Sequence, residues 1–496
     1  MTMLYLILLV LFIIALYKYS TCNYDYWKKK KIPFDQPKLF FGSIKDAAFF
    51  HKNIPQIVGE IYRKYSKSPF VGFYKMRTPC LLLTTPDLIE EAFVHGSDSF
   101  WKNELTVEPS LDPVLAGMLF SNVGQKWKKN RELFTPILTT RKIKQVLPFL
   151  VEGIKDLIDH IHKNKTLEAR DLISRYVADA NALSAFGVVG NSFKDDNAVF
   201  RQMSQTFMDP TITFGLKIFV MVVAPNLAKL LRLKIISASF VEYVKKTIKI
   251  ATKYRYDNQI KNNHIIDQIL KLTKNDKKSD EMNLLSFAFS FILDPTTANQ
   301  ESYVLYSLAS HLGVQKKLQI EIDEVLKKYD DKITFDAIQE MSYLDCVISE
   351  TLRLYPAVQI NMKRCTGYFE FKVKNDQDEI VSVEPGMSIA ASVIGMHHDE
   401  RYFKYAQEFI PERFSEKNKN KIIKGTYIPF GIGKRYCAGM KLAVYLMKIS
   451  TIAIIKEFEI SVNPKTGNPF DLNPFVVMAI PKSGLWIDFK ARNNKV

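Results

Sequence analysis

A lone cysteine lies in a short loop near the C-terminus that is rich in glycine and in cations. The stretch PFGIGKRYCAG, at 429–439, holds Cys437, three glycines and the adjacent pair Lys434 and Arg435. A thiolate is a strong metal ligand, and a neighbouring cation favours the ionised form of a thiol. Glycines let the backbone approach a flat, bulky ligand closely, and Arg435 is suited to bidentate binding of a carboxylate. The loop indicates a metal-containing cofactor held by a thiolate; the alternative is a buried cysteine in a turn.

Two further groups of side chains have helical spacing. The stretch SETLRLYP places Glu350 three residues before Arg353, so the two side chains share one helix face and can bond. The stretch WKKNR places Trp127 four residues before Arg131. Taken alone, each pattern is also typical of a solvated or amphipathic helix.

The elements that must position these residues favour a mainly α-helical chain with a smaller β region. Residues 68–85 alternate β-prone runs around a turn and predict a hairpin. Apolar residues then recur at helical spacing over 86–354. Strand patterns return over 368–393, with turns predicted at Asn375–Asp376 and Pro385–Gly386. The apolar run 218–224 is too short to span a membrane, which leaves a core helix or an apolar edge that dips into a membrane.

The N-terminus predicts a membrane anchor. Residues 1–17 carry no charged side chain, and Lys18 and the cluster WKKKK follow them. This length is near the minimum for a spanning helix, and no signal-peptide cleavage pattern is visible. We expect a retained anchor at 1–26, with a signal peptide or a core helix as alternatives, a basic and proline-containing hinge at 27–42, and one large domain at 43–496. The basic cluster after the apolar run places that domain in the cytosol.

Composition limits the choice of partners and compartments. The chain of 496 residues has a net charge of +17, which favours acidic partners or an anionic membrane surface. The cations are scattered, and no nucleic-acid-binding motif is present, so we expect no nucleic acid partner. The five cysteines are sparse and odd in number, which favours a reducing compartment. They form no C-x-x-C pair, which gives little support for a structural zinc site.

The spacing around the thiol resembles a known signature. Phe430-x-x-Gly433-x-Arg435-x-Cys437-x-Gly439 is similar to the haem-binding signature of the cytochrome P-450 superfamily, in which a cysteine thiolate ligates haem iron. The likeness covers nearly the whole chain and is strongest to insect microsomal members of the detoxification type. It implies the cytochrome P-450 fold and haem b (iron protoporphyrin), with Cys437 as the metal ligand and Phe430, Arg435 and Gly439 at the cofactor.

The resemblance also assigns roles to the other motifs. It implies that Glu350, Arg353 and Arg413, the last from the stretch PERF, form a structural cluster behind the haem. It places Trp127 and Arg131 at the haem propionates. The stretch KRCTGYF aligns Lys363 with another propionate-binding cation, and the adjacent Arg364 is the alternative because a lysine lacks the guanidinium fork.

The central helix departs from the family pattern. The family places an acid next to a threonine that delivers protons over the haem, and this chain has Asp294, Pro295, Thr296 and Thr297 instead. The resemblance therefore implies Asp294, Thr296 and Thr297 as catalytic residues. A proline inside a helix removes one N–H and presses on the carbonyl four residues back, so we expect a kink. The kink either seats water for an unusual proton relay or impairs the chemistry.

As the resemblance implies, the function is a monooxygenase that inserts one oxygen atom of O2 into a hydrophobic small molecule. The expected electron source is NADPH through NADPH-cytochrome P-450 reductase, with cytochrome b5 as a further candidate partner. The expected location is the endoplasmic reticulum membrane, in contact with lipid, with the catalytic domain facing the cytosol. The alternatives are a haem-thiolate isomerase or dehydratase and a catalytically impaired haem-binding protein. Candidate cations for reductase docking are Lys128, Lys129, Lys434 and Lys441.

Overall fold

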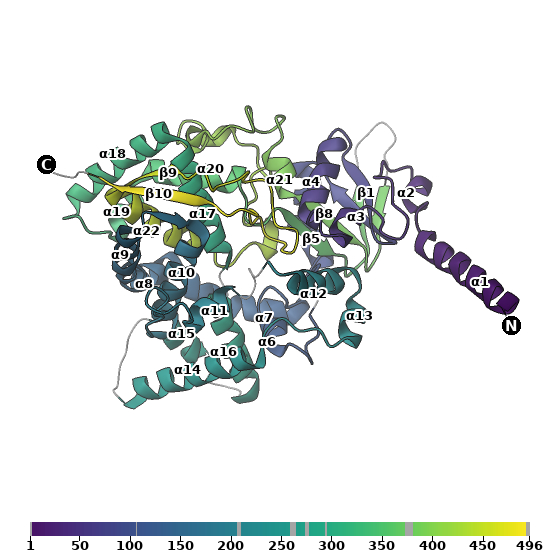
Figure 1. The fold of residues 1–496 in the computed structure, drawn as a ribbon, viewed down its shortest axis with the longest axis horizontal. Helices are drawn as coiled ribbons and strands as arrows, with labels where there is room; N and C mark the ends of the chain where they lie inside the picture. The colour runs from purple at the N-terminus through teal and green to yellow at the C-terminus, as the bar shows by residue number, and fades with distance from the viewer. Residues whose placement is uncertain are drawn as a thin grey trace.

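The computed structural model describes residues 2–105, 107–205, 210–257, 264–272, 277–292, 295–372 and 380–492. Helices dominate these residues, and the strands gather mainly at the end from which α1 projects (Figure 1). The helices are α1 (Thr2–Thr21), α2 (Tyr26–Lys29), α3 (Lys45–Ala48), α4 (Ile54–Lys64), α5 (Pro86–Glu90), α6 (Pro113–Gly117), α7 (Gly124–Phe134), α8 (Thr140–Glu152), α9 (Ile154–Lys163), α10 (Ala169–Phe186), α11 (Val199–Gln205), α12 (Ile212–Val223), α13 (Pro225–Leu230), α14 (Ala238–Asp257), α15 (Ile265–Leu272), α16 (Lys277–Ile292), α17 (Pro295–Ser310), α18 (Leu312–Lys328), α19 (Phe335–Glu340), α20 (Ser342–Leu354), α21 (Val393–His397) and α22 (Met440–Glu457).

The strands form three sheets in the described part of the chain. A five-stranded sheet has the order β1-β2-β8-β5-β3, a three-stranded sheet has the order β4-β10-β9, and β6 pairs with β7. Their bounds are β1 (Phe70–Lys75), β2 (Thr78–Leu83), β3 (Lys102–Asn103), β4 (Thr166–Glu168), β5 (Ile360–Arg364), β6 (Phe369–Lys372), β7 (Ile380–Val383), β8 (Ser388–Ser392), β9 (Phe458–Val462) and β10 (Trp486–Ala491). The mainly helical fold class with a smaller β region is confirmed.

The predicted hairpin is the antiparallel pair β1–β2, whose register runs from Phe70 opposite Leu83 to Lys75 opposite Thr78. Strand β2 then pairs in parallel with β8, and β5 and β8 pair antiparallel. The predicted turn at Pro385–Gly386 is present, and the positive φ of Gly386 (94°) suits glycine there. The turn predicted at Asn375–Asp376 lies outside the described residues.

The segment 27–42, expected to be a hinge, packs against the sheet. The Trp27 side chain is fully buried, and its indole N–H donates to the carbonyl of Phe73 at 3.3 Å. Gly72 makes this contact possible, because a Cβ at that position would lie 2.3 Å from the indole ring. Phe34 forms a bridge with the same glycine. These contacts tie the segment to the folded body.

Two apolar helices differ in how much they are buried. Helix α1 contains a stretch, Met3–Thr21, that is long and apolar enough to cross a membrane, and its side chains are almost all exposed. Helix α12 contains most of the run 218–224 and buries Ile218, Met221 and Val222, while Ile212 and Leu216 remain exposed. The run therefore belongs partly to the core, and the outer face of α12 is apolar.

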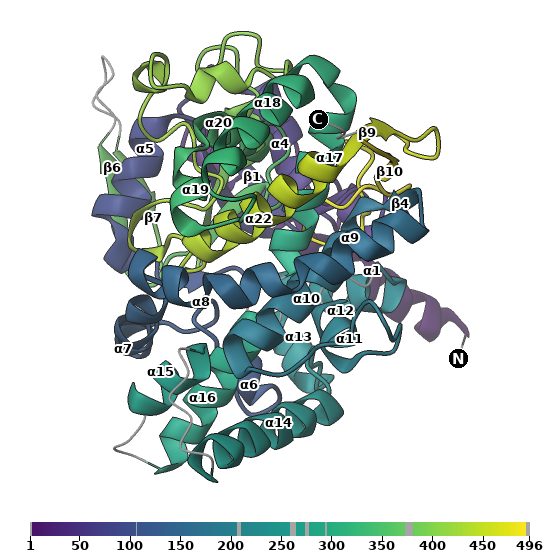
Figure 2. The ribbon, with the colours of Figure 1, turned by 90° about the vertical axis from the view of Figure 1, so that its left-hand side faces the viewer.

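Three long helices enclose the centre of the molecule. Almost every side chain of α17 is buried, because α10, α20 and α22 pack around it. Helix α22 lies alongside α8 and α9 as well (Figure 2). Residues 429–439, called here the thiol loop because they contain Cys437, immediately precede α22. The packing of this helix therefore fixes where the loop lies.

Candidate active site

The thiol loop folds back on itself just before α22. The backbone N–H of Cys437 donates to the carbonyl of Phe430 at 2.9 Å, and Ala443 donates to the carbonyl of Gly439 at 2.9 Å. Gly433 has φ of +73°, and a Cβ there would lie 1.9 Å from the carbonyl oxygen of Phe93. Glycine is therefore required at this point of the loop. The N-terminus of α22 adds partial positive charge close to Cys437, which favours a negative sulfur.

Cys437 lines a cavity of about 400 Å³, called here the central cavity. Its walls come from α7, α10, α16, α17, α20, α21, α22 and β5, from the segment 118–120 and from the thiol loop. Apolar side chains include Phe134, Phe291 and Ile360. Of the residues expected at the site from the sequence, the cavity brings together Trp127, Arg131, Thr296, Thr297, Lys363, Phe430, Arg435, Cys437 and Gly439.

Three cations at the central cavity have no carboxylate within ion-pair distance among the described residues. Arg131 donates to the carbonyl of Tyr436 at 3.0 Å, Arg435 donates to the carbonyl of Phe120 at 3.2 Å, and Lys363 bonds to the side chain of Asn103. One guanidinium nitrogen of Arg435, Nη1, is buried without a partner. Burial, with Arg435 nearby, lowers the pKa of Lys363 to about 7. This group of side chains is electrostatically incomplete without an anion.

The residues present fit haem. A thiolate is one of the ligands that proteins use to hold haem iron. Haem also carries two carboxylates, and buried charges in proteins are normally paired. The indole of Trp127 is buried and lies under the guanidinium of Arg435, 4.9 Å from it. The thiol of Cys437 and the three cations therefore supply the two kinds of group that haem needs.

Lys363 and Arg364 lie on opposite faces of β5, as neighbours on a strand must. Lys363 lines the central cavity, whereas Arg364 is not among the residues that line it. Arg364 instead donates to Glu104 at 2.7 Å, and Lys75 and Ser388 bond to the same carboxylate. Lys363 therefore faces the central cavity, whereas Arg364 forms a half-buried ion pair away from it.

The kink expected at Pro295 stays a prediction, because the two residues before the proline, 293 and 294, lie outside the described residues. On either side of them, α16 is described up to Ile292 and α17 from Pro295 onward. Thr296 and Thr297 follow it and line the central cavity. Asp294 lies outside the described residues.

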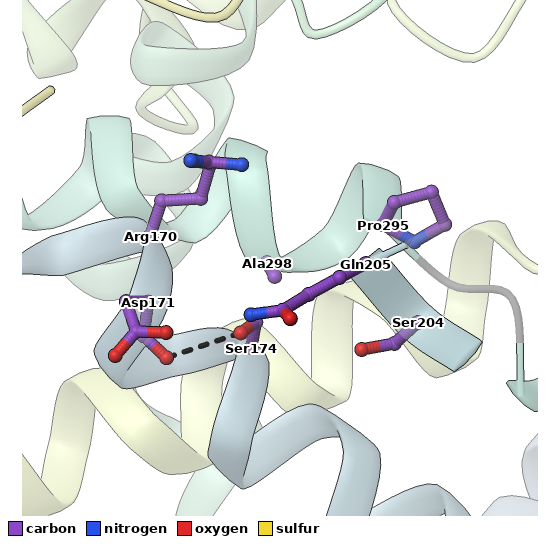
Figure 3. Close-up of a pocket in the computed structure, with 7 residues that line it drawn as sticks. All are labelled: Arg170, Asp171, Ser174, Ser204, Gln205, Pro295 and Ala298. Carbon is purple, nitrogen blue, oxygen red and sulfur yellow. Dashed lines mark hydrogen bonds between the residues drawn. The ribbon is translucent and has the colours of Figure 1, made fainter. Parts of the chain in front are cut away.

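A second, smaller hollow lies on another side of the first turn of α17. It has a volume of about 30 Å³, enough for about one or two waters. Figure 3 shows Pro295 and Ala298 of α17 beside Ser204 and Gln205 of α11, with Arg170, Asp171 and Ser174 on α10. The first turn of α17 therefore separates this polar hollow from the central cavity.

The structure brings Glu350, Arg353 and Arg413 together. Glu350 and Arg353 are fully buried and form two hydrogen bonds of 2.8 Å, and Arg413 reaches Glu350 at 3.1 Å. Arg353 also donates to three backbone carbonyls, those of His397, Ala406 and Glu408. The cluster thus joins α20 to the segment 397–413, which precedes the thiol loop.

Sequence reasoning missed a buried acid, Glu301. It lies on α17, one turn after Thr297, and is fully buried. Its Oε1 accepts hydrogen bonds from Ser450 at 3.0 Å and Thr451 at 2.9 Å, both on α22. Burial raises its pKa to about 8. The available signal was the run of polar residues 299–302 inside a helix expected in the core.

We expect Glu301 to make the free energy of unfolding fall as pH rises from about 4.5 to about 8. In this window the folded protein holds a proton that the unfolded chain releases, so each pH unit costs up to about 1.4 kcal/mol. Glu301→Gln should remove this part of the slope and stabilise the protein more at pH 8 than at pH 5. Thermal unfolding midpoints of both proteins across this range would measure the effect.

The control for this pH effect is Glu324→Gln, which replaces an exposed carboxylate on α18. It should leave the pH profile of the unfolding midpoint as it is in the unmodified protein. Parallel profiles for the unmodified protein and Glu301→Gln would show that Glu301 is ionised in the folded state, against the expectation.

Comparison with known proteins agrees with this geometry. The family model for cytochrome P-450 matches residues 32–487. Cytochrome P-450 6j1 of Blattella germanica is 30% identical over 490 residues, which cover 97% of this chain and 96% of that protein. Cytochrome P-450 6B7 of Helicoverpa armigera is 29% identical over 499 residues, covering 97% of each chain. Cytochrome P-450 9b2 of Drosophila melanogaster is 28% identical over 491 residues, covering 96% of this chain and 97% of its own. All three relatives are insect proteins, as expected from the sequence.

Proposed function

This chain belongs to the cytochrome P-450 family of haem monooxygenases, and we propose that it oxidises a hydrophobic small molecule with electrons from NADPH, delivered by a flavin reductase. The observation that carries the proposal is the central cavity. It combines an exposed cysteine just before α22, three cations that have no carboxylate within ion-pair distance in the described part of the chain, and largely apolar walls.

Two groups of residues in the central cavity would hold haem, one at its iron and one at its propionates. Cys437 would ligate the iron, and Trp127, Arg131, Lys363 and Arg435 would bind the propionates. Phe430 and Gly439 would face the porphyrin, because both line the cavity and a Cβ at Gly439 would point toward the sulfur of Cys437 at 4.0 Å. Once bound, haem supplies the redox chemistry that splits O2 and transfers one oxygen atom to the substrate.

The chain's own contribution is to bind the substrate, exclude water and deliver protons. Apolar side chains of the central cavity, such as Phe291 and Val358, would hold a hydrophobic substrate. The hydroxyls of Thr296 and Thr297 would pass protons into the cavity. Asp294, separated from Thr296 by Pro295 in the sequence, would be the acid that supplies this relay. The small hollow beside Pro295 offers room for water on the other side of the same turn.

Electrons would enter from the face that carries the thiol loop. Lys129, Lys434 and Lys441 are exposed there, and Lys128 is half-buried, lying 5.1 Å from the ring of Trp101. Such a basic surface suits an acidic partner, as proposed for NADPH-cytochrome P-450 reductase and for cytochrome b5. Charge complementarity of this kind affects the rate of association most.

We propose that the protein is anchored in the endoplasmic reticulum membrane with its catalytic domain in the cytosol. Helix α1 is long and apolar enough to span a membrane, and the basic cluster 28–31 follows it. The exposed apolar side chains Ile212, Leu216 and Leu230 on α12 and α13 would add a second contact with lipid.

The proton relay is tested by Thr296→Val. The variant should keep haem and substrate binding but release at least severalfold more hydrogen peroxide for each NADPH consumed, because proton delivery fails after electrons have entered. Thr297→Val should have a smaller effect, because its side chain points about 100° further round the helix. Peroxide yield per NADPH, measured with an active reductase and a substrate, checks both.

Three outcomes would count against the proposed relay or function. Equal and low peroxide yields in all three proteins would mean that neither hydroxyl carries protons. High peroxide yield in the unmodified protein would mean that Pro295 has already impaired the relay. Absence of any NADPH consumption, with the reductase shown to be active on another cytochrome P-450, would favour an isomerase, a dehydratase or a haem-binding protein without turnover.

A further inference from the structure

Two buried amide side chains at the central cavity have polar atoms without hydrogen-bond partners. Asn181 of α10 is 1% exposed, and Gln300 of α17 is 3% exposed. Both line the central cavity. Among the described residues, the oxygen Oδ1 of Asn181 and the nitrogen Nε2 of Gln300 make no hydrogen bond. Buried polar side-chain atoms in folded proteins are nearly always hydrogen-bonded, so a ligand is expected to complete them.

The orientation of the Gln300 amide is fixed by the protein. Its oxygen Oε1 accepts the backbone N–H of Ala357 at 2.9 Å. The nitrogen Nε2 is therefore left as an unused donor. Asn181 offers the complementary group, an unused acceptor, on a helix that packs along α17. A ligand that completes both amides must therefore accept a hydrogen bond from Gln300 and donate one to Asn181.

The propionates of haem cannot provide both hydrogen bonds that Asn181 and Gln300 lack. A carboxylate has no donor for the oxygen of Asn181, and the two would repel each other. The cations that suit the propionates are Arg131, Lys363 and Arg435, on α7, β5 and the thiol loop, and neither amide belongs to those elements. The group that completes the amides is consequently part of the substrate, or a water in its place.

We propose that the substrate is a hydrophobic alcohol whose hydroxyl donates to Asn181 and accepts from Gln300. A hydroxyl is the simplest group that both donates and accepts. The apolar walls of the central cavity would hold the hydrocarbon skeleton, and the two amides would reject a hydrocarbon that leaves them unpaired. This inference rests on the proposed function, because it assigns a substrate class to the same cavity.

The test compares menthol with p-menthane, which differ by one hydroxyl. Dissociation constants are measured by isothermal titration calorimetry on the full-length, haem-loaded protein in detergent. The unmodified protein should bind menthol about tenfold more tightly than p-menthane. Asn181→Leu and Gln300→Met should each remove most of this preference, by weakening menthol binding while leaving p-menthane at least as tightly bound.

Ser290→Ala is the matched control. Ser290 lines the same cavity, but its hydroxyl already donates to the carbonyl of Ser286 at 2.8 Å, so the preference for menthol should survive. Asn181→Leu is the decisive variant, because Oδ1 of Asn181 makes no hydrogen bond to any described residue that the change could break. Asn181→Leu should therefore fold at least as well as the unmodified protein. Gln300→Met, in contrast, loses the hydrogen bond with the backbone N–H of Ala357.

Equal binding of menthol and p-menthane by the unmodified protein would overturn the inference. So would an unchanged preference in Asn181→Leu, since the amides would then hold only water. Either result, with a normal thiolate spectrum and NADPH-dependent turnover, leaves the proposed monooxygenase function intact. A missing thiolate spectrum in the unmodified protein would instead count against the proposed function itself.

Discussion

Cys437→His is expected to abolish the red-shifted Soret band that the reduced protein gives with carbon monoxide, and to abolish oxygenation with it. The band requires thiolate ligation of haem iron, which Cys437 would provide, and the same thiolate would support the oxygen chemistry that haem supplies when bound. Cys437 lines the central cavity at the N-terminus of α22, so an imidazole in its place could still face the iron. We therefore expect retained haem with an altered spectrum, and loss of activity by several orders of magnitude. Difference spectra and haem content measure the two effects separately.

The matched control is Cys22→Ser, which replaces the other exposed cysteine of the chain. Cys22 follows α1, and its sulfur lies 3.5 Å from Arg77, away from the central cavity. This variant should keep the band and the activity. A band of normal position and height in Cys437→His would show that another residue ligates the iron, and the reading of the site would fail.

The thiol loop and the Glu350–Arg353 pair could be predicted because each rests on short-range spacing, whereas Arg413 was assigned to this pair only by the family resemblance. The positions from Phe430 to Gly439 lie within one loop, and Glu350 and Arg353 lie one turn apart on a helix. Local geometry of this kind depends little on the rest of the fold. The hairpin β1–β2 was predictable for the same reason, since its two strands are joined by a turn of two residues.

The features that could not be decided from the sequence depend on tertiary packing. The choice between Lys363 and Arg364 depends on which face of β5 meets the cavity, and this is set by β8 and by Glu104 from a distant segment. The packing of Trp27 depends on Gly72, far along the chain. The kink expected at Pro295 stays a prediction, because residues 293 and 294, on which it depends, lie outside the described part of the chain.

Glu301, Asn181 and Gln300 were missed for a different reason. A helix pattern is read from its apolar residues, and polar residues between them are assigned to solvent. Helix α17 is buried almost all round, so its polar side chains face other helices or the central cavity. Polar residues that remain in such a helix must find partners inside the protein or in a ligand. This requirement connects the buried acid and the two amides to the chemistry of the cavity.

Glu350→Ala is expected to destabilise the protein by about 3–5 kcal/mol, because it leaves a buried charge without its partner. Arg353 is fully buried, and Glu350 is the carboxylate that it contacts. The change also removes the acceptor of the Ile410 N–H and one partner of Arg413. Because the cluster holds the segment 397–413 that leads into the thiol loop, we expect poor expression and loss of haem. Soluble yield, haem content and the unfolding midpoint measure these effects.

Glu412→Ala is the matched control, since Glu412 lies next to Arg413 but forms an ion pair of 2.8 Å with the exposed Lys317. Exposed pairs of this kind contribute about 0–1 kcal/mol, so the control should express normally and keep its haem. Comparing Glu350→Ala with Glu412→Ala separates the effect of removing a buried carboxylate from the effect of removing a partly exposed one close to Arg413. If Glu350→Ala folds with normal stability, holds haem and loses only turnover, Glu350 acts in the reaction and its structural role is refuted.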